Sequence, residues 1–309
     1  MIEEGENTGV TEQTQTQAAA PDARAGGTFD IIDLGTVHRL GFGAMRITGP
    51  GIWGEPADRE VARNVVRRAV ELGTDFIDTA DAYGPNVSEE IIAEAIHSDD
   101  RSAPYGEVKL ATKIGNTRQG PDLWAQVGRP AYLRQAMELI LRRLKIDKID
   151  LLQLHRIDAE TPAEQQFETL AAFQAEGKVG ALGLSEVSVA EIEKASEFFT
   201  VATVQNRYNL TDRKSEDVLD YSTEHGIGFI PWAPISAGQL AAPGGPVAEA
   251  AERLGATGSQ VALAWLLRRS PAMLPIPGTG SIEHLEENIG AASVILDDEA
   301  YESIAAAVA

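Results

Sequence analysis

The chain has 309 residues, of which 43% are hydrophobic and 24% charged, and its 26 basic and 47 acidic residues give a net charge of −21. The absence of cysteine excludes disulfide bonds, thiolate catalysis and cysteine-ligated metal centres. The acidic excess argues against a nucleic-acid partner, and the longest apolar runs, such as 261–267, are too short to span a bilayer. We therefore expect a soluble, cytoplasmic protein without a membrane or nucleic-acid partner.

The N-terminal region divides into a polar tail and a first structured element. Residues 1–27 are rich in Glu, Thr, Gln, Ala and Gly and contain almost no large apolar side chains, a composition typical of disorder. Residues 29–40 predict a short β-hairpin that turns near Leu34-Gly35. The expected organisation is a disordered acidic and polar tail over 1–27 and a single catalytic domain over 28–309.

From residue 40 onward, short apolar strands alternate with amphipathic helices. The expected strands cover 40–45, 75–79, 108–113, 149–155, 179–184, 201–205, 227–232 and 273–276. The expected helices cover 57–72, 88–96 with Ser88 as N-cap, 130–144, 162–176, 188–198, 214–225, 248–254, 259–270, 281–291 and 297–308. The strands are nearly continuous apolar runs, as strands buried on both faces should be.

Eight strand–helix units in about 270 residues predict an α/β fold, a closed (β/α)8 TIM barrel with the N-terminal hairpin plugging its bottom. The main rival is a doubly wound open sheet, which requires a Gly-x-Gly-x-x-Gly fingerprint after its first strand. The segment Gly41-Phe42-Gly43-Ala44-Met45-Arg46 has only the first two glycines, and no periodic helix begins there. The barrel is therefore the predicted fold.

Three neighbouring strands end on ionisable residues. Asp78 ends the second strand and is followed by Tyr83 in its loop, whereas Lys113 ends the third strand and His155 the fourth. Active sites of such barrels lie at the C-terminal ends of the strands, so these side chains should meet at one rim. A buried lysine requires a carboxylate, and its ammonium should lower the pKa of a neighbouring tyrosine toward working pH. Such a tyrosine can protonate a developing alkoxide, while neutral His155 orients a carbonyl oxygen.

The residues alone also allow simpler interpretations. Asp78 could cap the next helix or form a structural ion pair with Lys113, and His155 could be a hydrogen-bonded core residue. The convergence of four such residues at one rim favours a catalytic site. The five histidines, at 38, 97, 155, 225 and 284, form no i,i+4 pair and no cluster, which argues against metal-assisted chemistry.

Five short motifs follow one another along the chain: Leu40-Gly41-Phe42-Gly43, Asp78-Thr79-Ala80-x-x-Tyr83-Gly84, Ala111-Thr112-Lys113, Asp150-Leu151-Leu152-x-x-His155 and Ile276-Pro277-Gly278-Thr279. In this order and spacing they resemble the aldo-keto reductase family, from about residue 29 to the C-terminus. The resemblance implies a barrel enzyme that reduces aldehydes and ketones with NADPH. It also implies a catalytic tetrad in which Tyr83 is the general acid, the Lys113–Asp78 pair polarises it, and His155 orients the substrate.

The resemblance also places cofactor contacts on later strand ends. Ser185 and Gln205-Asn206 correspond to contacts with the nicotinamide carboxamide. Trp232 corresponds to an aromatic ring stacked on the nicotinamide, with core packing as the alternative. The segment 277–281 precedes a helix, whose first N–H groups suit a phosphate. The expected cofactor contacts are Gly43, Ala44, Met45, Asp78, Ser185, Gln205, Trp232, Ala233, Pro234, Ile235, Pro277, Gly278, Thr279, His284, Glu287 and Asn288.

The sequence departs from the family pattern near the expected phosphate site. The loop often carries Lys or Arg in the family, but here it has Gly278 and Gly280, and the family's helix arginine falls near His284 among glutamates. Glu186 stands where many members carry Asn or Arg. Because hydroxyl groups in the loop can still donate to a phosphate, we expect NADPH rather than NADH.

The first loop, 45–56, should overhang the site. Trp53 in this loop offers an aromatic wall and Arg46 a cation for an anionic group. A surface ion pair is the alternative for Arg46, and it is the preferred interpretation for Arg207. The segments Gly43-Ala44-Met45 and Gly49-Pro50-Gly51 resemble a bacterial branch of the family that includes pyridoxal reductases (pyridoxine 4-dehydrogenases). The expected substrate is a small carbonyl compound held by Trp53, Arg46, Tyr83 and His155, with pyridoxal as the specific candidate.

Two classes of function remain open at this point. The first is an NADP-dependent oxidoreductase that transfers hydride from NADPH to an aldehyde or ketone. The second is a cofactor-bound regulatory or sensor subunit with little turnover, similar to the β subunits of potassium channels, which also keep the tetrad. Either protein would be a monomer or a small homo-oligomer.

Overall fold

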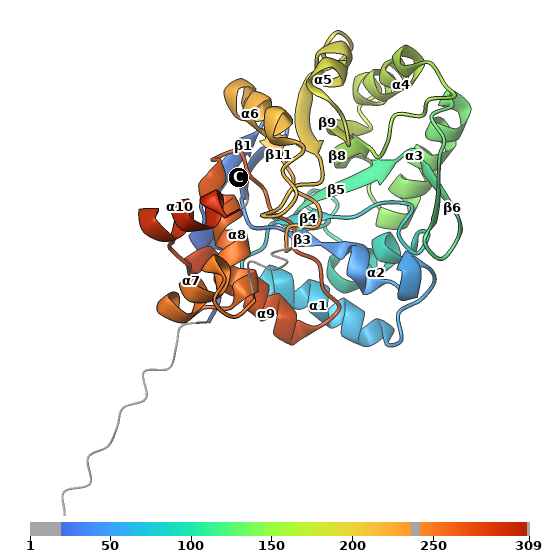
Figure 1. Cartoon of the computed structure of the whole chain (residues 1–309). Helices are drawn as coiled ribbons and strands as arrows, with labels where there is room; N and C mark the ends of the chain where they lie inside the picture. The colour runs from blue at the N-terminus through green and yellow to red at the C-terminus, as the bar shows by residue number, and fades with distance from the viewer. Residues whose placement is uncertain (1–19, 236–241, 308–309) are drawn as a thin grey trace, which may run out of the picture.

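The computed structural model describes residues 20–235 and 242–307, and its central feature is a curled parallel sheet (Figure 1). The strands lie in the order β3-β4-β5-β8-β9-β10-β11. Their bounds are β3 Phe42–Gly43, β4 Phe76–Asp78, β5 Lys109–Ile114, β8 Ile149–Leu154, β9 Val179–Ser185, β10 Val201–Gln205 and β11 Gly228–Phe229. The parallel pairing and the helical crossovers confirm the predicted α/β barrel architecture.

The barrel closes through the segment 272–277, which contains the predicted eighth strand. Two backbone hydrogen bonds of 2.8 and 2.9 Å join this segment to β11. On the other side, Gly41 N–H donates to Pro275 O (2.9 Å) and Gly43 N–H to Pro277 O (3.3 Å). Because proline has no N–H donor, the segment completes the barrel without forming a regular strand.

Helices cover the outside of the barrel (Figure 1). Their bounds are α1 Arg59–Glu71, α2 Val87–Ile96, α3 Pro130–Leu144, α4 Ala163–Ala175, α5 Val189–Ser196, α6 Glu216–His225, α7 Pro246–Leu254, α8 Gly258–Arg269, α9 Ile282–Gly290 and α10 Asp298–Ala306. These bounds agree with the predicted ones to within two residues. One predicted detail is wrong: Ser88 lies inside α2, whose N-cap is Asn86, and its buried hydroxyl donates to Ala44 O (3.0 Å).

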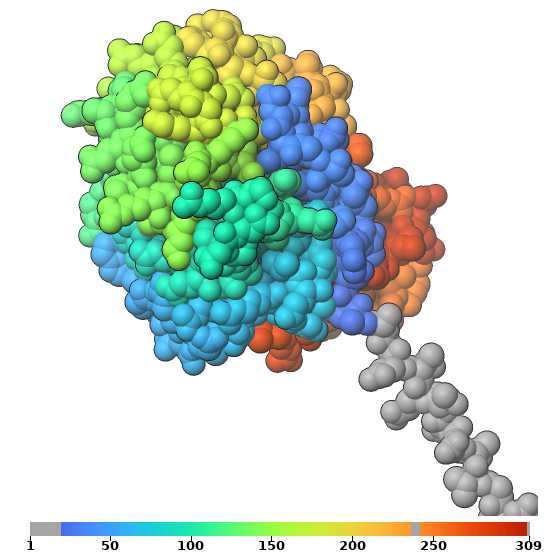
Figure 2. Space-filling model, turned by 180° about the vertical axis from the view of Figure 1, so that it is seen from behind, coloured from blue at the N-terminus to red at the C-terminus, as the bar shows by residue number. Residues whose placement is uncertain are grey.

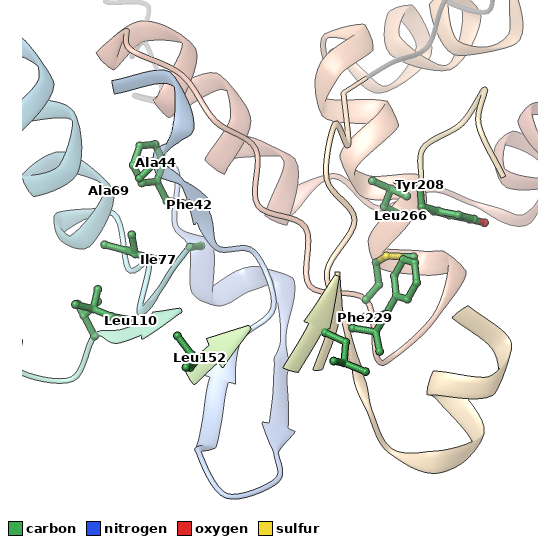
Figure 3. Packing of buried hydrophobic residues seen from close by; sticks show 14 of the residues in the cluster. Phe42, Ala44, Ala69, Ile77, Leu110, Leu152, Tyr208, Phe229 and Leu266 are labelled. Carbon is green, nitrogen blue, oxygen red and sulfur yellow. The ribbon is translucent and has the colours of Figure 1, made fainter. Parts of the chain in front are cut away.

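In the central strands, such as β4 and β8, neighbouring residues belong to two separate apolar cores. Ile77 and Leu152 pack in the large core between the strands and the helices, part of which Figure 3 shows. Phe76 and Leu151, which precede them, pack in a smaller core inside the barrel. Side chains alternate between the two faces of a strand, so both faces of these strands are buried. This burial explains the continuous apolar runs in the sequence.

The N-terminal hairpin closes the bottom of the barrel, as predicted. It consists of β1 (Thr28–Ile31) and β2 (Gly35–His38), which pair antiparallel. Ile31 and Val37 are buried in the core inside the barrel. Figure 2 shows this N-terminal segment, in blue, lying across the back of the molecule.

The predicted disordered tail is too long at its C-terminal end. Residues 1–19 lie outside the described part of the chain, but Ala23–Gly26 form a short 3-10 helix N-capped by Asp22. Ala23 is fully buried, and its N–H donates to Leu72 O at the end of α1 (2.8 Å). The small residues of this 3-10 helix did not predict it, because contacts with distant parts of the chain stabilise it.

The loop after β5 contains a hairpin that the sequence analysis did not predict. It consists of β6 (Asn116–Gly120) and β7 (Leu123–Gln126), which pair antiparallel. The tip of this hairpin has residue types that favour turns, Gly120-Pro121-Asp122, and these could have predicted the hairpin from the sequence. Within 20–235 and 242–307, no helix combines the length and the apolar character needed to cross a membrane.

Candidate active site

The four residues of the predicted tetrad meet at one end of the barrel. Asp78 is the last residue of β4, Lys113 lies in β5 and His155 directly follows β8, and these three strands are neighbours in the sheet. Tyr83 lies in the loop after β4. The exposed fractions of the four residues are all 6% or less. The parallel strands therefore carry these side chains to one buried position at their C-terminal ends.

Lys113 is the centre of the hydrogen-bond network. Its Nζ donates to Asp78 Oδ1 (2.5 Å), to Thr79 O (2.8 Å) and to Tyr83 Oη (3.2 Å). Burial lowers the pKa of Lys113, but the oxygens of Asp78 and Tyr83 outweigh this effect and raise the pKa above its ordinary value. The ammonium therefore remains charged although the side chain is fully buried.

Asp78 is held by donors on both of its oxygens. Oδ2 accepts from the side-chain amides of Gln153 (3.1 Å) and Gln205 (2.8 Å), while Oδ1 accepts from the ammonium of Lys113. The interpretation of Asp78 as a helix cap is wrong, because the N-cap of α2 is Asn86. The carboxylate instead fixes the position and the charge of Lys113.

Tyr83 differs from the expectation in its pKa. Burial raises the pKa of Tyr83 above its ordinary value, and the nearby ammonium of Lys113 only partly offsets this effect. The predicted lowering of this pKa is therefore wrong, because the phenol is almost completely removed from water. The consequence suits a general acid, since the phenol keeps its proton at neutral pH.

His155 is a neutral imidazole beside the phenol. Burial and the cationic side chains of Lys113, Arg156 and Arg118 hold the pKa of His155 well below its ordinary value. Its ring packs edge-on against Tyr83, with ring centroids 5.9 Å apart. Nδ1 is buried and has no hydrogen-bond partner among the described residues. The alternative interpretation of His155 as a hydrogen-bonded core residue requires a partner for its ring, and Nδ1 has none among the described residues.

Trp124 is a candidate site residue that the sequence analysis missed. It lies in β7, and its indole is 6.3 Å from the ring of Tyr83 and 5.9 Å from that of His155 between centroids, both edge-on. The unpredicted hairpin therefore places an aromatic ring next to Tyr83 and His155. Trp53, which the sequence did predict as a wall, pairs with Gly84 in an isolated bridge next to Tyr83.

Ser185 and Gln205 end two further strands, β9 and β10, at the same rim. Ser185 Oγ accepts a 2.9 Å hydrogen bond from Arg156, a partly buried arginine that the sequence analysis did not single out. The amide nitrogen of Gln205 is already bonded to Asp78. Asn206 is bonded through both side-chain atoms to the backbone of Val187, so it holds the loop after β9.

Trp232 lies at the rim with its ring fixed by polar contacts. Its indole N–H donates to Glu186 Oε1 (2.5 Å), and the same oxygen accepts from the N–H of Arg207 (2.6 Å). The guanidinium of Arg207 lies 5.3 Å from the Trp232 ring centroid and forms an ion pair with Asp212 (3.1 Å). The surface ion pair expected for Arg207 is confirmed. Ala233 and Ile235 are exposed and Pro234 is buried.

The expected phosphate site lies where β3 meets the segment 277–281. A Cβ at Gly43 would lie 2.5 Å from Ile276 O, and one at Gly278 would lie 2.6 Å from Gly43 O, so glycine is required at both positions. Ser281 caps α9, and Thr279 Oγ1 accepts from its N–H (3.0 Å).

Arg46 lies against this same segment. A Cβ at Gly278 would be 3.7 Å from Arg46 Cγ, and one at Gly280 would be 3.1 Å from Arg46 O. The side chain is exposed and has no ion pair with the described part of the chain. Arg46 therefore lies beside the expected phosphate loop, and its expected contact with the substrate stays a prediction.

Three further expected cofactor residues lie on α9. Asn288 is buried, and His284 is exposed. Glu287 Oε1 accepts from Thr257 Oγ1 (2.6 Å), which ties it to the N-cap of α8. Among the described residues, no three His, Cys, Asp or Glu side chains form a group that could hold a metal ion.

Comparisons with known proteins agree with the fold and identify the family. The sequence profile described as "Aldo/keto reductase family" matches residues 39–309. An uncharacterized oxidoreductase of Schizosaccharomyces pombe is 47% identical over 92% of this chain and 90% of its own. Pyridoxine 4-dehydrogenase of Escherichia coli is 40% identical over 86% of this chain and 94% of its own.

The solved structures include an aldo/keto reductase of Klebsiella pneumoniae in complex with NADP and acetate. It superposes with a TM-score of 0.74 at 25% identity, over 90% of this chain and 93% of the other. The chain therefore belongs to the aldo/keto reductase family and is an NAD(P)H-dependent oxidoreductase.

Proposed function

We propose that this protein reduces an aldehyde or ketone with NADPH and that Tyr83 delivers the proton. The observation that carries the proposal is the 3.2 Å contact between Tyr83 Oη and the ammonium of Lys113, two side chains that are 6% and 0% exposed. When bound, NADPH supplies a hydride to the carbonyl carbon. The phenol then donates its proton to the oxygen, on which negative charge develops.

The surrounding residues make this proton transfer favourable. The ammonium of Lys113 stabilises the phenolate that remains, and Asp78 keeps the ammonium in place. His155, as a neutral imidazole 5.9 Å from the Tyr83 ring, suits a hydrogen bond to the carbonyl oxygen. Its low pKa means that it does not compete with Tyr83 as the acid.

The chain offers a suitable surface for each end of the cofactor. Ser185 Oγ and the Gln205 amide, at the ends of β9 and β10, suit the carboxamide, and the Trp232 ring suits stacking on the nicotinamide. The N-terminus of α9, with the hydroxyls before it, suits the adenosine phosphate. Arg46, at the edge of this loop, supplies the cation that the loop itself lacks, and we assign it to the cofactor instead of the substrate.

The proposed substrate class is flat aromatic aldehydes, and pyridoxal is the specific candidate. The Trp124 ring lies against Tyr83, and Trp53, whose backbone pairs with Gly84 next to Tyr83, is proposed as a second aromatic wall. The relative named pyridoxine 4-dehydrogenase supports a pyridine ring with polar substituents. Trp53, Trp124, Tyr83 and His155 form the proposed substrate contacts.

The test combines cofactor binding with turnover. NADPH and NADH are titrated by fluorescence, and NADPH oxidation is then followed with pyridoxal, benzaldehyde and propanal. Tighter binding of NADPH and faster turnover of pyridoxal than of benzaldehyde support the full proposal. Equal rates on both aromatic aldehydes would remove the pyridoxal assignment. Tight binding without turnover of any aldehyde would overturn the reductase and favour a regulatory subunit.

A further inference from the structure

Arg118, in β6, hydrogen-bonds to backbone carbonyl groups of three different loops. Its Nη1 donates to Ile52 O (2.6 Å) in the first loop and to Ala82 O (3.0 Å) in the loop after β4. Within its own hairpin, Nε donates to Leu123 O (3.0 Å). Nη2 adds bonds to Gly51 O (2.8 Å) and Gly120 O (3.3 Å). The guanidinium uses all three of its nitrogens in this way.

The same guanidinium contacts both aromatic walls of the site. It stacks on Trp124, 3.7 Å from the ring centroid, and lies 5.8 Å from the centroid of Trp53. It forms no ion pair with an acidic side chain in the described part of the chain, unlike most arginines on the helices. An arginine held in this way by carbonyl oxygens and indole rings fixes the positions of both.

The backbones of the three loops also bind one another around Arg118. Asp122 N–H donates to Gly51 O (3.0 Å), Gly84 N–H to Ile52 O (3.2 Å), and Gly54 N–H to Gly84 O (2.6 Å). Ile52 and Asp122 have φ angles of 54° and 55°, in the left-handed region that L residues avoid. Such conformations persist only where surrounding contacts impose them, and Arg118 provides contacts on both sides.

The geometry points to Arg118 as a positioning residue for catalysis. Its bond to Ala82 O reaches the peptide unit that leads directly into Tyr83, the proton donor. Its stacking on Trp124 fixes the ring that lies against both Tyr83 and His155. The side chain of Arg118 therefore positions both the proposed proton donor, Tyr83, and the aromatic ring of Trp124. The expected effect on turnover rests on the proposed reductase function, whereas the expected effect on the order of the three loops does not.

The test compares Arg118→Met and Arg118→Lys with Arg134→Met in the full-length chain. Arg134 is a matched control, because its guanidinium also lies over an aromatic ring, 5.6 Å from the centroid of Phe173, and hydrogen-bonds to Glu176. It belongs to α3 and not to the loops around Tyr83. Hydrogen exchange is measured on peptides covering 48–56, 80–85 and 116–126. In both Arg118 variants we expect faster hydrogen exchange in these three segments than in the wild type. In Arg134→Met we expect wild-type exchange in all three segments.

Kinetics supply the second readout. We expect kcat/KM for benzaldehyde to fall about 100-fold in Arg118→Met, with a rise in KM, because both the wall and the donor lose their positions. For propanal, which is too small to contact both indoles, we expect a loss in kcat with KM nearly unchanged. Arg118→Lys keeps the charge but not the planar set of donors, so it should resemble Arg118→Met.

Several outcomes separate the possibilities. Wild-type activity in Arg118→Lys would mean that charge alone matters and would overturn the inference, as would unchanged exchange in the three segments. If Arg118→Met does not fold, the lysine variant decides alone. A wild-type protein that reduces no aldehyde would refute the proposed function, while the exchange experiment would still test the positioning role.

Discussion

Replacing Lys113 by methionine tests the buried ion pair on which the site depends. The substitution removes three hydrogen bonds of the ammonium and leaves the carboxylate of Asp78, which is 1% exposed, without a counter-charge. Removing one partner of a buried pair typically costs about 3–5 kcal/mol. Because Gln153 and Gln205 still donate to Asp78, we expect the lower end, about 3 kcal/mol of unfolding free energy at pH 7.

The assay is urea unfolding of a double-mutant cycle. Lys113→Met, Asp78→Asn and the double variant are compared with the wild type at pH 7. In the double variant the buried charge is absent, so part of the stability should return, with a coupling energy of at least about 1 kcal/mol. A loss below about 1 kcal/mol in Lys113→Met, or strictly additive effects, would refute the reasoning.

Three further substitutions test separate parts of the site. Tyr83→Phe should lower kcat about 10²–10⁴-fold while NADPH affinity stays unchanged, and retained turnover would exclude this proton donor. Asp81 lies in the loop between β4 and Tyr83 and is 6% exposed. Burial raises the pKa of Asp81 well above its ordinary value, so the unfolded chain loses its proton first and stability falls as pH rises above about 3.8. Asp81→Asn should therefore stabilise the protein more at pH 8 than at pH 5 in thermal melts, and equal gains would contradict this. Arg46→Met should raise the Kd for NADPH about tenfold, whereas the exposed Arg142→Met should not, and equal Kd values would return Arg46 to the substrate side.

The fold was predictable because its signals are local and repeated. Each strand is a buried apolar run followed by an amphipathic helix, and eight repetitions leave few arrangements of the chain. The segment 272–277 shows the limit of this reasoning. Its apolar residues predicted a strand, but its prolines remove the donors that a regular strand needs, so only the barrel as a whole shows that it closes the sheet.

The convergence of the candidate site residues was predictable because strand ends in a barrel converge, but their surroundings were not. Trp124 and Arg118 lie in a hairpin within a loop. The contact of Trp124 with Tyr83 and the hydrogen bond of Arg118 to Ala82 O depend on how three loops fold against one another. The predicted direction of the Tyr83 pKa shift was wrong for a related reason. From sequence, the nearby charge of Lys113 was visible, whereas the degree of burial, which raises this pKa, depends on the complete fold.

The charges at the rim explain how a chain of net charge −21 can bind an anionic cofactor. Most helix arginines pair with acidic side chains, as Arg68 does with Glu286, so their charges cancel locally. Arg118 and Arg156 instead donate to carbonyl and hydroxyl oxygens, and neither forms an ion pair with an acidic side chain in the described part of the chain. At physiological ionic strength, charges more than about 8 Å away through solvent are largely screened. The proposed cofactor, and the negative charge proposed to develop on the substrate oxygen, would therefore be affected more by these local positive charges than by the distant acidic excess.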